Sequence, residues 1–321
     1  MIQKVLISGE ELLLKVFSEC PMDRRDFLKT TIVTGITFAI PGNASLFIKA
    51  LEAAEKTDLV VAHGLTPAGI TKAAIDGLGG IRAFISKGDI VVVKPNIGWD
   101  RLPEYAATTN PEVVSTVVAL CYEAGAKQVK VFDHSVVDPR RCYKQSGISE
   151  AATAAGGIVS YVDDRKFRDV TLSGVALKSW PLYTEAIEAD KFINIPIAKT
   201  HGLSTLTLGM KNLMGIMGSS RGRIHQRIDD SLVDLAMAVK PTLIILDAVR
   251  ILTANGPQGG DLADVRQLNT VIAGRDQVAV DAFGATLFGL KGAALGYVVA
   301  GHKAGLGTMD LSKLRIKKIN V

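Results

Sequence analysis

Short continuous apolar runs, separated by segments of helical length, are the feature of this 321-residue sequence that most restricts its fold. Runs of this kind are typical of strands that are buried on both faces. Their alternation with helices indicates βαβ units, and therefore an α/β fold with a mainly parallel sheet and helices on both faces. We expect strands at 89–93, 129–132, 157–162, 192–197, 242–246, 270–273 and 314–321.

Two of the helices between these strands have clear N-terminal capping signals in the sequence. Pro67 follows Thr66 and opens a helix toward Leu78, and Pro111 follows Asn110 and opens a second one. A capping side chain followed by proline at the first helical position is a common helix start, because proline has no N–H to leave unpaired there. Further helices are expected at 148–155, 231–239, 278–288 and 297–304.

The amino-terminal region carries a pattern of targeting rather than of folding. Arg24 and Arg25 precede Phe27-Leu28-Lys29, and a weakly apolar stretch of 11 residues follows at 30–40. That stretch is too short to span a bilayer as an ordinary helix. Paired arginines before a weakly apolar segment identify a twin-arginine signal. We therefore expect a folded protein that is exported by the twin-arginine translocation machinery and works in the periplasm or outside the cytoplasm.

The place of this motif suggests how the chain is divided. Such motifs usually lie near the start of a chain, and Met22 stands just before this one. We therefore interpret residues 1–21 as a start-site artefact, with a real amphipathic extension as the alternative. Residues 22–44 are the expected signal peptide and residues 45–321 a single α/β domain. If the signal is not cleaved, it would be the protein's contact with the membrane.

Charge and cysteine content exclude several classes of function. The net charge of +5 is mild and favours small anionic ligands. Aromatic residues are not interleaved with basic ones, so we expect no nucleic acid partner. The three cysteines, at 20, 121 and 142, include no CxxC spacing, which excludes an all-cysteine iron–sulfur cluster and a cysteine-rich zinc site. Cys121 falls on an apolar helix face, so a buried thiol is favoured over a disulfide with Cys142.

Polar residues follow five of the expected strands directly. Ligands of open α/β sheets gather at the carboxyl ends of the strands, so these residues form a candidate site. The alternative is that they are polar only because loops are polar. The residues are Lys94 and Asn96, Asp133 and His134, Lys199 and His201, Asp247 and Arg250, and Arg275 and Asp276.

Three histidines stand out within this pattern. His134 and His201 are placed at strand ends, and His225 follows a loop at 215–223 that is rich in glycine, serine and arginine. Histidine can act as a general acid, a general base or a metal ligand near neutral pH. A single histidine is more often structural, but together these indicate a catalytic site.

The loop at 215–223 adds two guanidinium groups, Arg221 and Arg223. Guanidinium and backbone N–H groups suit a carboxylate or phosphate. We expect both arginines to bind an anionic substrate, together with Lys94, Asn96 and Lys199. The alternative is a mobile surface lid.

Several stretches resemble the family known as domain of unknown function 362. The family has no assigned activity, so this resemblance implies relatedness over roughly residues 60–290 and no reaction. The stretches are 91–98, 109–113, 124–126, 195–201, 208–215, 225–230 and 281–282.

A more distant resemblance, to the amino-terminal domain of nickel-dependent lactate racemase, implies a mechanism. It implies that His134 and His201 are an acid/base pair. Lys211, ten residues after His201, would hold a nickel pincer nucleotide covalently beside Asn212, and His225 would bind the nickel. In such enzymes a hydride passes to the cofactor while a histidine removes the hydroxyl proton.

The sequence also departs from that family. The substrate motif of the racemase is replaced by Trp99-Asp100-Arg101, and its glycine pair before the lysine is reduced to Leu208-Gly209-Met210. We therefore expect an exported enzyme of the oxidoreductase or isomerase type, which acts on a small hydroxy acid-like anion by proton or hydride transfer. The alternatives are a non-catalytic periplasmic carrier of a ligand or metal, and a module that binds membrane surfaces through its basic tail.

Overall fold

The computed structural model describes residues 57–321, so the expected start-site extension at 1–21, the signal peptide at 22–44 and Cys20 lie outside the described residues. Within 57–321, no helix combines the length and the apolar character needed to cross a membrane. The described chain forms one ten-stranded sheet and a separate two-stranded sheet.

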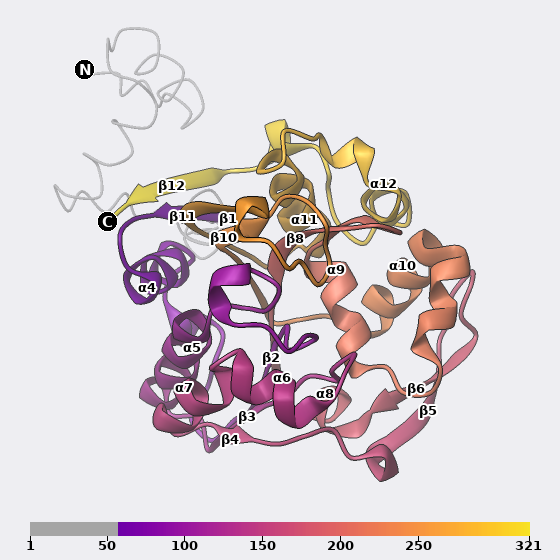
Figure 1. Ribbon diagram of the computed structural model, residues 1–321, viewed down its shortest axis with the longest axis horizontal. Helices are drawn as coiled ribbons and strands as arrows, with labels where there is room; N and C mark the ends of the chain where they lie inside the picture. Colours follow the sequence, from indigo (N-terminus) through magenta and orange to yellow (C-terminus); the bar gives the residue numbers. More distant parts are fainter. Residues whose placement is uncertain (1–56) are drawn as a thin grey trace, which may run out of the picture. The chain divides into compact units, whose positions relative to one another are not determined.

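The large sheet is mainly parallel, as predicted. Its strands are β1 Leu59–His63, β2 Ile90–Pro95, β3 Gln128–Val131, β4 Ile158–Val159, β7 Lys191–Ile195, β8 Ile197–His201, β9 Thr205–Thr207, β10 Leu243–Leu252, β11 Val265–Gly274 and β12 Ile316–Asn320. Their order is β12-β1-β11-β10-β7-β2-β3-β4, with β8 paired to β10 and β9 paired to β8. Figure 1 shows β12 at one edge of this sheet and β4 at the other. Only the β1–β11, β10–β11 and β8–β9 pairs of this described sheet are antiparallel.

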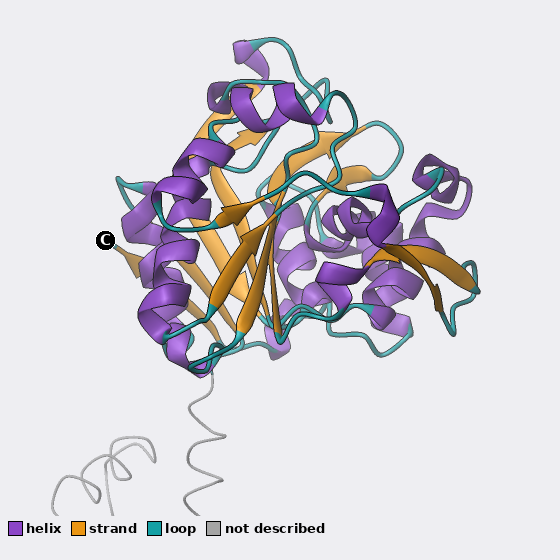
Figure 2. Ribbon diagram, turned by 90° about the horizontal axis from the view of Figure 1, so that it is seen from below, coloured by secondary structure: helices purple, strands orange, loops and turns teal. Residues whose placement is uncertain are grey.

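Helices cover both faces of this sheet, which confirms the predicted fold class (Figure 2). Val91 and Val93 pack into one apolar cluster, while Val92 between them packs into the other, as strand alternation requires. The first cluster includes residues of α4 Pro67–Gly77, α5 Pro111–Ala124, α6 Pro139–Gln145 and α7 Ile148–Ala154. The second includes residues of α8 Thr184–Ile187, α9 Gly209–Asn212, α10 Ile228–Ala238, α11 Gln277–Thr286 and α12 Gly296–Lys303.

The helix-start signals are confirmed by their hydrogen bonds. The hydroxyl of Thr66 accepts from the N–H of Gly69 at 3.2 Å, and the side-chain oxygen of Asn110 accepts from Glu112 N–H at 2.9 Å. Gly125 ends α5 with a φ of 100°, a left-handed conformation that costs glycine little. Cys121 and Cys142 are buried free thiols, as favoured, and burial raises the pKa of Cys121 to about 12.

Several strand boundaries differ from the prediction. The run expected at 192–197 is divided into β7 and β8 at Pro196, because proline has no N–H to donate to the ladder. The strand expected at 157–162 is limited to β4. β1 was not anticipated, nor was the two-stranded sheet of β5 Phe167–Thr171 and β6 Ser179–Tyr183.

The direction of β11 corrects part of the predicted site. Since β11 is antiparallel to β10, its carboxyl end lies at the opposite edge of the sheet from those of β2 and β3. Arg275 lies 4.4 Å from the centre of the Phe84 ring, and Asp276 caps α11 by accepting from Ala279 N–H at 2.9 Å. Arg275 and Asp276 are therefore structural residues, and the prediction that they join the other strand ends was wrong.

Candidate functional site

A cavity of about 620 Å³ lies where β2, β3 and β8 end. The exposed side chain of Arg223 is not among its lining residues, so the prediction that Arg223 binds substrate does not fit this structure. Nine other residues were predicted to act in catalysis or to bind substrate, cofactor or metal, and all nine line the cavity: Lys94, Asn96, His134, Lys199, His201, Lys211, Asn212, Arg221 and His225.

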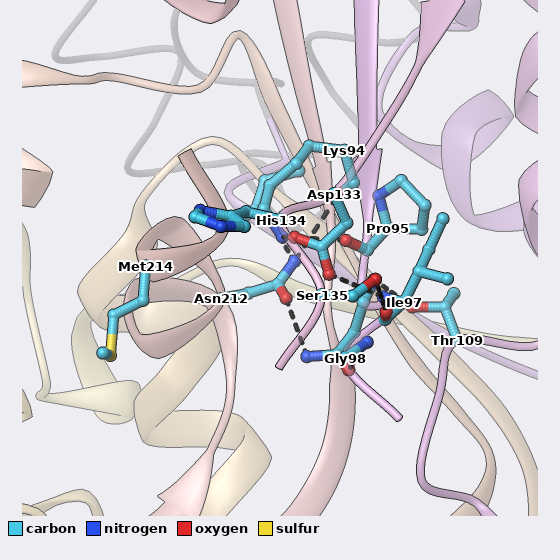
Figure 3. Close-up of polar contacts among 12 residues, drawn as sticks. Lys94, Pro95, Ile97, Gly98, Thr109, Asp133, His134, Ser135, Asn212 and Met214 are labelled. Atoms are coloured by element: carbon cyan, nitrogen blue, oxygen red, sulfur yellow. Dashed lines mark hydrogen bonds and ion pairs between the residues drawn. The ribbon is translucent and has the colours of Figure 1, made fainter. Parts of the chain in front are cut away.

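A buried ion pair lies at the floor of the cavity. Lys94 Nζ is 2.7 Å from Asp133 Oδ1, and Asp133 Oδ2 accepts from Ile97 N–H at 2.6 Å (Figure 3). Burial lowers the pKa of Lys94, against the attraction of Asp133. Gly215 covers the pair so closely that a Cβ there would overlap Asp133 Oδ1. Glycine is therefore the residue that this floor can accept at position 215.

A chain of side-chain amides joins the strand ends to α9. Asn212 donates to Asn194 Oδ1 at 2.8 Å and accepts from Asn96 Nδ2 at 3.0 Å. The oxygen of Asn96 in turn accepts from Lys199 Nζ at 3.2 Å. The Asn212 amide, which was expected to bind a cofactor, therefore positions α9 against β2 and β7.

Two lysines in the cavity have unusually low pKa values. Burial lowers the pKa of Lys199 to about 7; repulsion from Lys211 and Lys94 adds to this, and attraction to Asp133 opposes it. Burial lowers the pKa of Lys211 to about 8, with a contribution from Arg221. Lys199 donates to Ala107 O at 2.5 Å, whereas Lys211 contacts Met214 Sδ at 3.0 Å and His225 Nε2 at 3.2 Å.

Arg221 is held in place by the backbone. Its two terminal nitrogens donate to Met214 O at 3.1 Å and to Ser135 O at 2.9 Å. Burial lowers its pKa, but a guanidinium group stays charged at any physiological pH. Together with Lys94, Lys199 and Lys211 it faces one acidic side chain, because Asp133 is the only carboxylate among the described residues that line the cavity.

Hydrogen bonds to the backbone define the tautomers of the three histidines. Backbone carbonyls only accept, so Nδ1 of His134 donates to Met217 O at 2.8 Å and Nδ1 of His225 donates to Gly222 O at 2.9 Å. Backbone N–H groups only donate, so Nδ1 of His201 accepts from Leu203 at 3.1 Å and its proton is on Nε2. His134 thus presents an unprotonated Nε2, whereas His201 presents an N–H donor.

All three imidazoles are biased toward the neutral form. Burial is the largest cause in each case, and it lowers the pKa of His201 to about 3. Positive neighbours add to the effect, Arg221 at His134 and Lys211 at both His201 and His225. A neutral His134 can accept a proton without first losing one, as a general base must.

Asp281 lies in one of the stretches that match the family, and its carboxylate positions the site. Its two carboxylate oxygens accept from Gly209 N–H at 2.6 Å and Met210 N–H at 2.9 Å, at the start of the helix that carries Lys211. Asp247 was predicted to follow a strand that ends at 246, but β10 continues to Leu252 and Asp247 lies within it. Asp247 likewise serves the backbone, accepting from Asn110 N–H at 2.7 Å. A carboxylate that accepts hydrogen bonds from backbone N–H groups far away in the sequence leaves no local sequence motif by which its role could be predicted.

The side chains of residues 57–321 do not build a metal site around His225. Residues 57–321 contain no group of three or more histidine, cysteine, aspartate or glutamate side chains that could hold one. The ring of His225 stacks on His201 with centroids 5.6 Å apart, and its Nε2 faces the Lys211 amine. The metal role that the lactate racemase resemblance implied for His225 is therefore not supported by the residues around it.

Comparison with known proteins relates the cavity to a family. The family model described as domain of unknown function (DUF362) matches residues 91–286, a range that includes every residue lining the cavity. A thylakoid-associated protein of Synechocystis sp. is 31% identical over 240 residues, which is 72% of this chain and 73% of that protein.

Two solved structures resemble the chain less closely. The lactate racemase apoprotein from Thermoanaerobacterium thermosaccharolyticum has a TM-score of 0.39 and 11% identity over 70% of this chain. A structural-genomics target from Thermotoga maritima has a TM-score of 0.37 and 12% identity over 64% of this chain. The chain spans 55% of the length of each of these proteins.

Proposed function

The chain belongs to the domain of unknown function 362 family, and we propose that it is an enzyme that binds a small anionic substrate and transfers a proton to and from it through His134. One observation carries the proposal. His134, whose Nε2 is unprotonated, lines the same cavity as Lys199, Lys211 and Arg221, and these three cations have no carboxylate partner among the described residues that line it.

The cations bind and orient the anion, and they stabilise negative charge that develops when a neighbouring C–H or O–H bond loses its proton to His134. His201 offers an Nε2–H donor from another strand. Lys211, with a pKa of about 8, is unprotonated in about a tenth of molecules at pH 7, so it can exchange a proton or attack a carbonyl carbon.

Hydride transfer would require a redox cofactor in addition to the side chains of the cavity. A redox cofactor tethered to Lys211 would supply the hydride acceptor that the lining side chains lack. The intact mass of protein purified from its own exporting host tests for it. An extra mass on the peptide that contains Lys211, lost in Lys211→Ala, supports the tether; an unmodified mass opposes it.

Proton transfer is tested by isotope exchange. The protein is incubated in D₂O with 2-hydroxy and 2-oxo acids, and loss of the C–H signal next to the carboxyl or carbonyl group is followed by ¹H NMR. We expect exchange that His134→Gln slows about 100-fold or more. His63→Gln is the matched control, since His63 is exposed on β1 and does not line the cavity.

The same experiment separates this enzyme from a carrier. A non-catalytic ligand-binding protein would bind these acids, show no exchange above the buffer rate and be indifferent to His134→Gln. That result would contradict the proposed catalytic activity but would still support an anion-binding site.

Export completes the proposal. The arginine pair at 24 and 25 directs the folded domain across a membrane, which agrees with the thylakoid association of the Synechocystis relative. Replacing both arginines with lysine should leave the protein in the cytoplasmic fraction of its host. Unchanged export of that double variant would contradict the signal.

A further inference from the structure

We infer that the cavity takes a dianionic headgroup of the phosphate monoester kind that carries an apolar group, rather than a monoanion of lactate size. This inference rests on the proposed function only in using the same anion site; it names the class of ligand. Three features of the described residues carry it: the number of unpaired cations, the way in which those cations are presented, and the make-up of the cavity mouth.

The charge of the cavity exceeds what a monoanion would neutralise. Asp133 is paired with Lys94 at 2.7 Å, which leaves Lys199, Lys211 and Arg221 without an acidic partner among the lining residues. Their hydrogen bonds go to neutral groups, namely carbonyls, an amide oxygen, a thioether and an imidazole. The two buried lysines and the half-buried Arg221 repel one another, so a ligand with two negative charges relieves more repulsion than a ligand with one.

The cations are also presented in a way that suits phosphate. Lys199 lies on β8 and Lys211 on α9, while Arg221 begins the 3₁₀ helix Arg221–Arg227, so the charges come from three separate elements. Lysine ammonium groups act as point charges and bind phosphate from several directions, whereas a planar carboxylate is best matched by one free guanidinium fork. Both terminal nitrogens of Arg221 already donate to carbonyls.

Apolar side chains lie at the mouth of the cavity. Leu203 and Val136 line the cavity and are 68% and 58% exposed, which places them where it opens to solvent. Trp99 and Pro257 line the cavity as well. A volume of about 620 Å³ lies in the range of sites for ligands much larger than a three-carbon acid. A ligand with its anionic end near the lysines and an apolar body at the mouth uses both parts.

Binding of a dianion has a consequence at Lys199. Its pKa of about 7 results from burial and from repulsion by Lys211 and Lys94, against attraction by Asp133. Two added negative charges raise that pKa, so the complex takes up a proton near pH 7. A monoanion raises it less.

Isothermal titration calorimetry of the full-length protein tests the inference with four ligands: phenyl phosphate, phenyl sulfate, benzoate and inorganic phosphate. Phenyl sulfate has nearly the same shape as phenyl phosphate but one charge fewer, because the second pKa of a phosphate monoester is about 6. We expect phenyl phosphate to bind at least about tenfold more tightly than each of the others, which is a difference of 1.4 kcal/mol in binding free energy.

Proton uptake is measured in the same titrations, at pH 7 in two buffers that differ in ionisation enthalpy. We expect the wild-type protein to take up a proton when it binds phenyl phosphate, and we expect this uptake to be reduced in Lys199→Met. Lys127→Met is the control and should leave the uptake unchanged, because Lys127 is exposed and precedes β3, at the end of that strand away from the cavity. The measurement on the unaltered protein stands even if Lys199→Met does not fold.

Each outcome decides a separate point. Equal affinity for phenyl sulfate and phenyl phosphate, or an absence of proton uptake, overturns the dianion inference while leaving the anion site of the proposed function intact. Tight binding of phenyl phosphate together with deuterium exchange that ignores His134 supports this inference and overturns the proposed activity. Equal affinity for inorganic phosphate and phenyl phosphate overturns the inference that the ligand carries an apolar group.

Discussion

The amine of Lys211 lies 3.2 Å from Nε2 of His225, so its partner in the cavity is a neutral imidazole and not a carboxylate. Nδ1 of His225 donates to Gly222 O, so Nε2 is free to accept from the amine. A neutral partner does little to hold the ammonium form, and burial lowers the pKa of Lys211 to about 8. The unprotonated amine of Lys211 is therefore populated close to neutral pH.

The first prediction concerns the reactivity of that amine. Acetylation by acetic anhydride, mapped by peptide mass spectrometry from pH 6 to 10, should give Lys211 an apparent pKa of about 8. An ordinary lysine titrates near 10.5, because its ammonium group is hydrated. Excess phenyl phosphate should slow the labelling of Lys211 and leave exposed lysines unaffected. An apparent pKa near 10 at Lys211 would contradict the structure of the cavity.

The second prediction concerns the tautomers of the histidines. Long-range ¹H–¹⁵N NMR should show the proton on Nδ1 of His134 and His225 and on Nε2 of His201. Because burial and the charge of Lys211 lower the pKa of His201 to about 3, this ring should remain neutral from pH 8 down to pH 5. Titration of His201 near the ordinary value of about 6.5 would show that the ring is solvated and has left this position.

Much of this arrangement could be predicted from sequence because parallel strands impose it. Lys94, His134 and Lys199 each follow or end an apolar run, and strands that run the same way deliver those residues to one edge. The reasoning failed at Arg275, because an apolar run does not reveal its direction. β11 reverses after a loop from β10, and the two form an antiparallel ribbon.

The sequence did not distinguish the roles of two arginines that lie two positions apart. Arg221 and Arg223 share one glycine-rich stretch, which folds as a 3₁₀ helix over Arg221–Arg227. With three residues per turn, positions two apart point in different directions, so one guanidinium enters the cavity and the other is exposed. Sequence composition gave both the same weight. Asp281, far along the chain, could be recognised only once α11 was placed beside α9.

The third prediction uses that pair of arginines as its own control. Arg221→Met should weaken binding of phenyl phosphate about 10- to 100-fold, since a charged hydrogen-bonding group contributes roughly 1.5–3 kcal/mol. Arg223→Met removes the same charge from the same helix and should change the affinity less than about twofold. Calorimetry measures both. Equal losses in the two variants would show that the effect comes from net charge and not from the cavity.

The fourth prediction concerns the support of α9. Asp281→Ala removes the acceptor for Gly209 N–H and Met210 N–H and leaves both buried, so the free energy of unfolding should fall by about 2–4 kcal/mol. Asp281→Asn keeps one oxygen and should lose less. Burial raises the pKa of Asp281 to about 7, so the amide also mimics its protonated form. Urea denaturation gives the stabilities, and the acetylation profile of Lys211 reports whether the amine has moved. A stable Asp281→Ala variant with an unchanged Lys211 profile would refute the positioning role.

The last prediction concerns stability in the ligand-free protein between pH 7 and 9. The folded-state pKa values of Lys199 and Lys211, about 7 and about 8, lie below the ordinary lysine value of 10.5, so these two lysines bind more protons in the unfolded chain throughout this interval. Asp281, with a pKa of about 7, opposes them only near pH 7, where its folded carboxyl still holds a proton. Stability therefore rises with pH, because deprotonation removes buried charges that the folded state must otherwise carry. Urea denaturation at pH 7, 8 and 9 should show an increasing free energy of unfolding. The slope should shrink in Lys199→Met and persist in Lys127→Met. Saturating phenyl phosphate should flatten it as well, because the anion stabilises the ammonium forms. A flat or falling profile without ligand would mean that both amines are solvated in the folded protein, and the low pKa values would then have no basis.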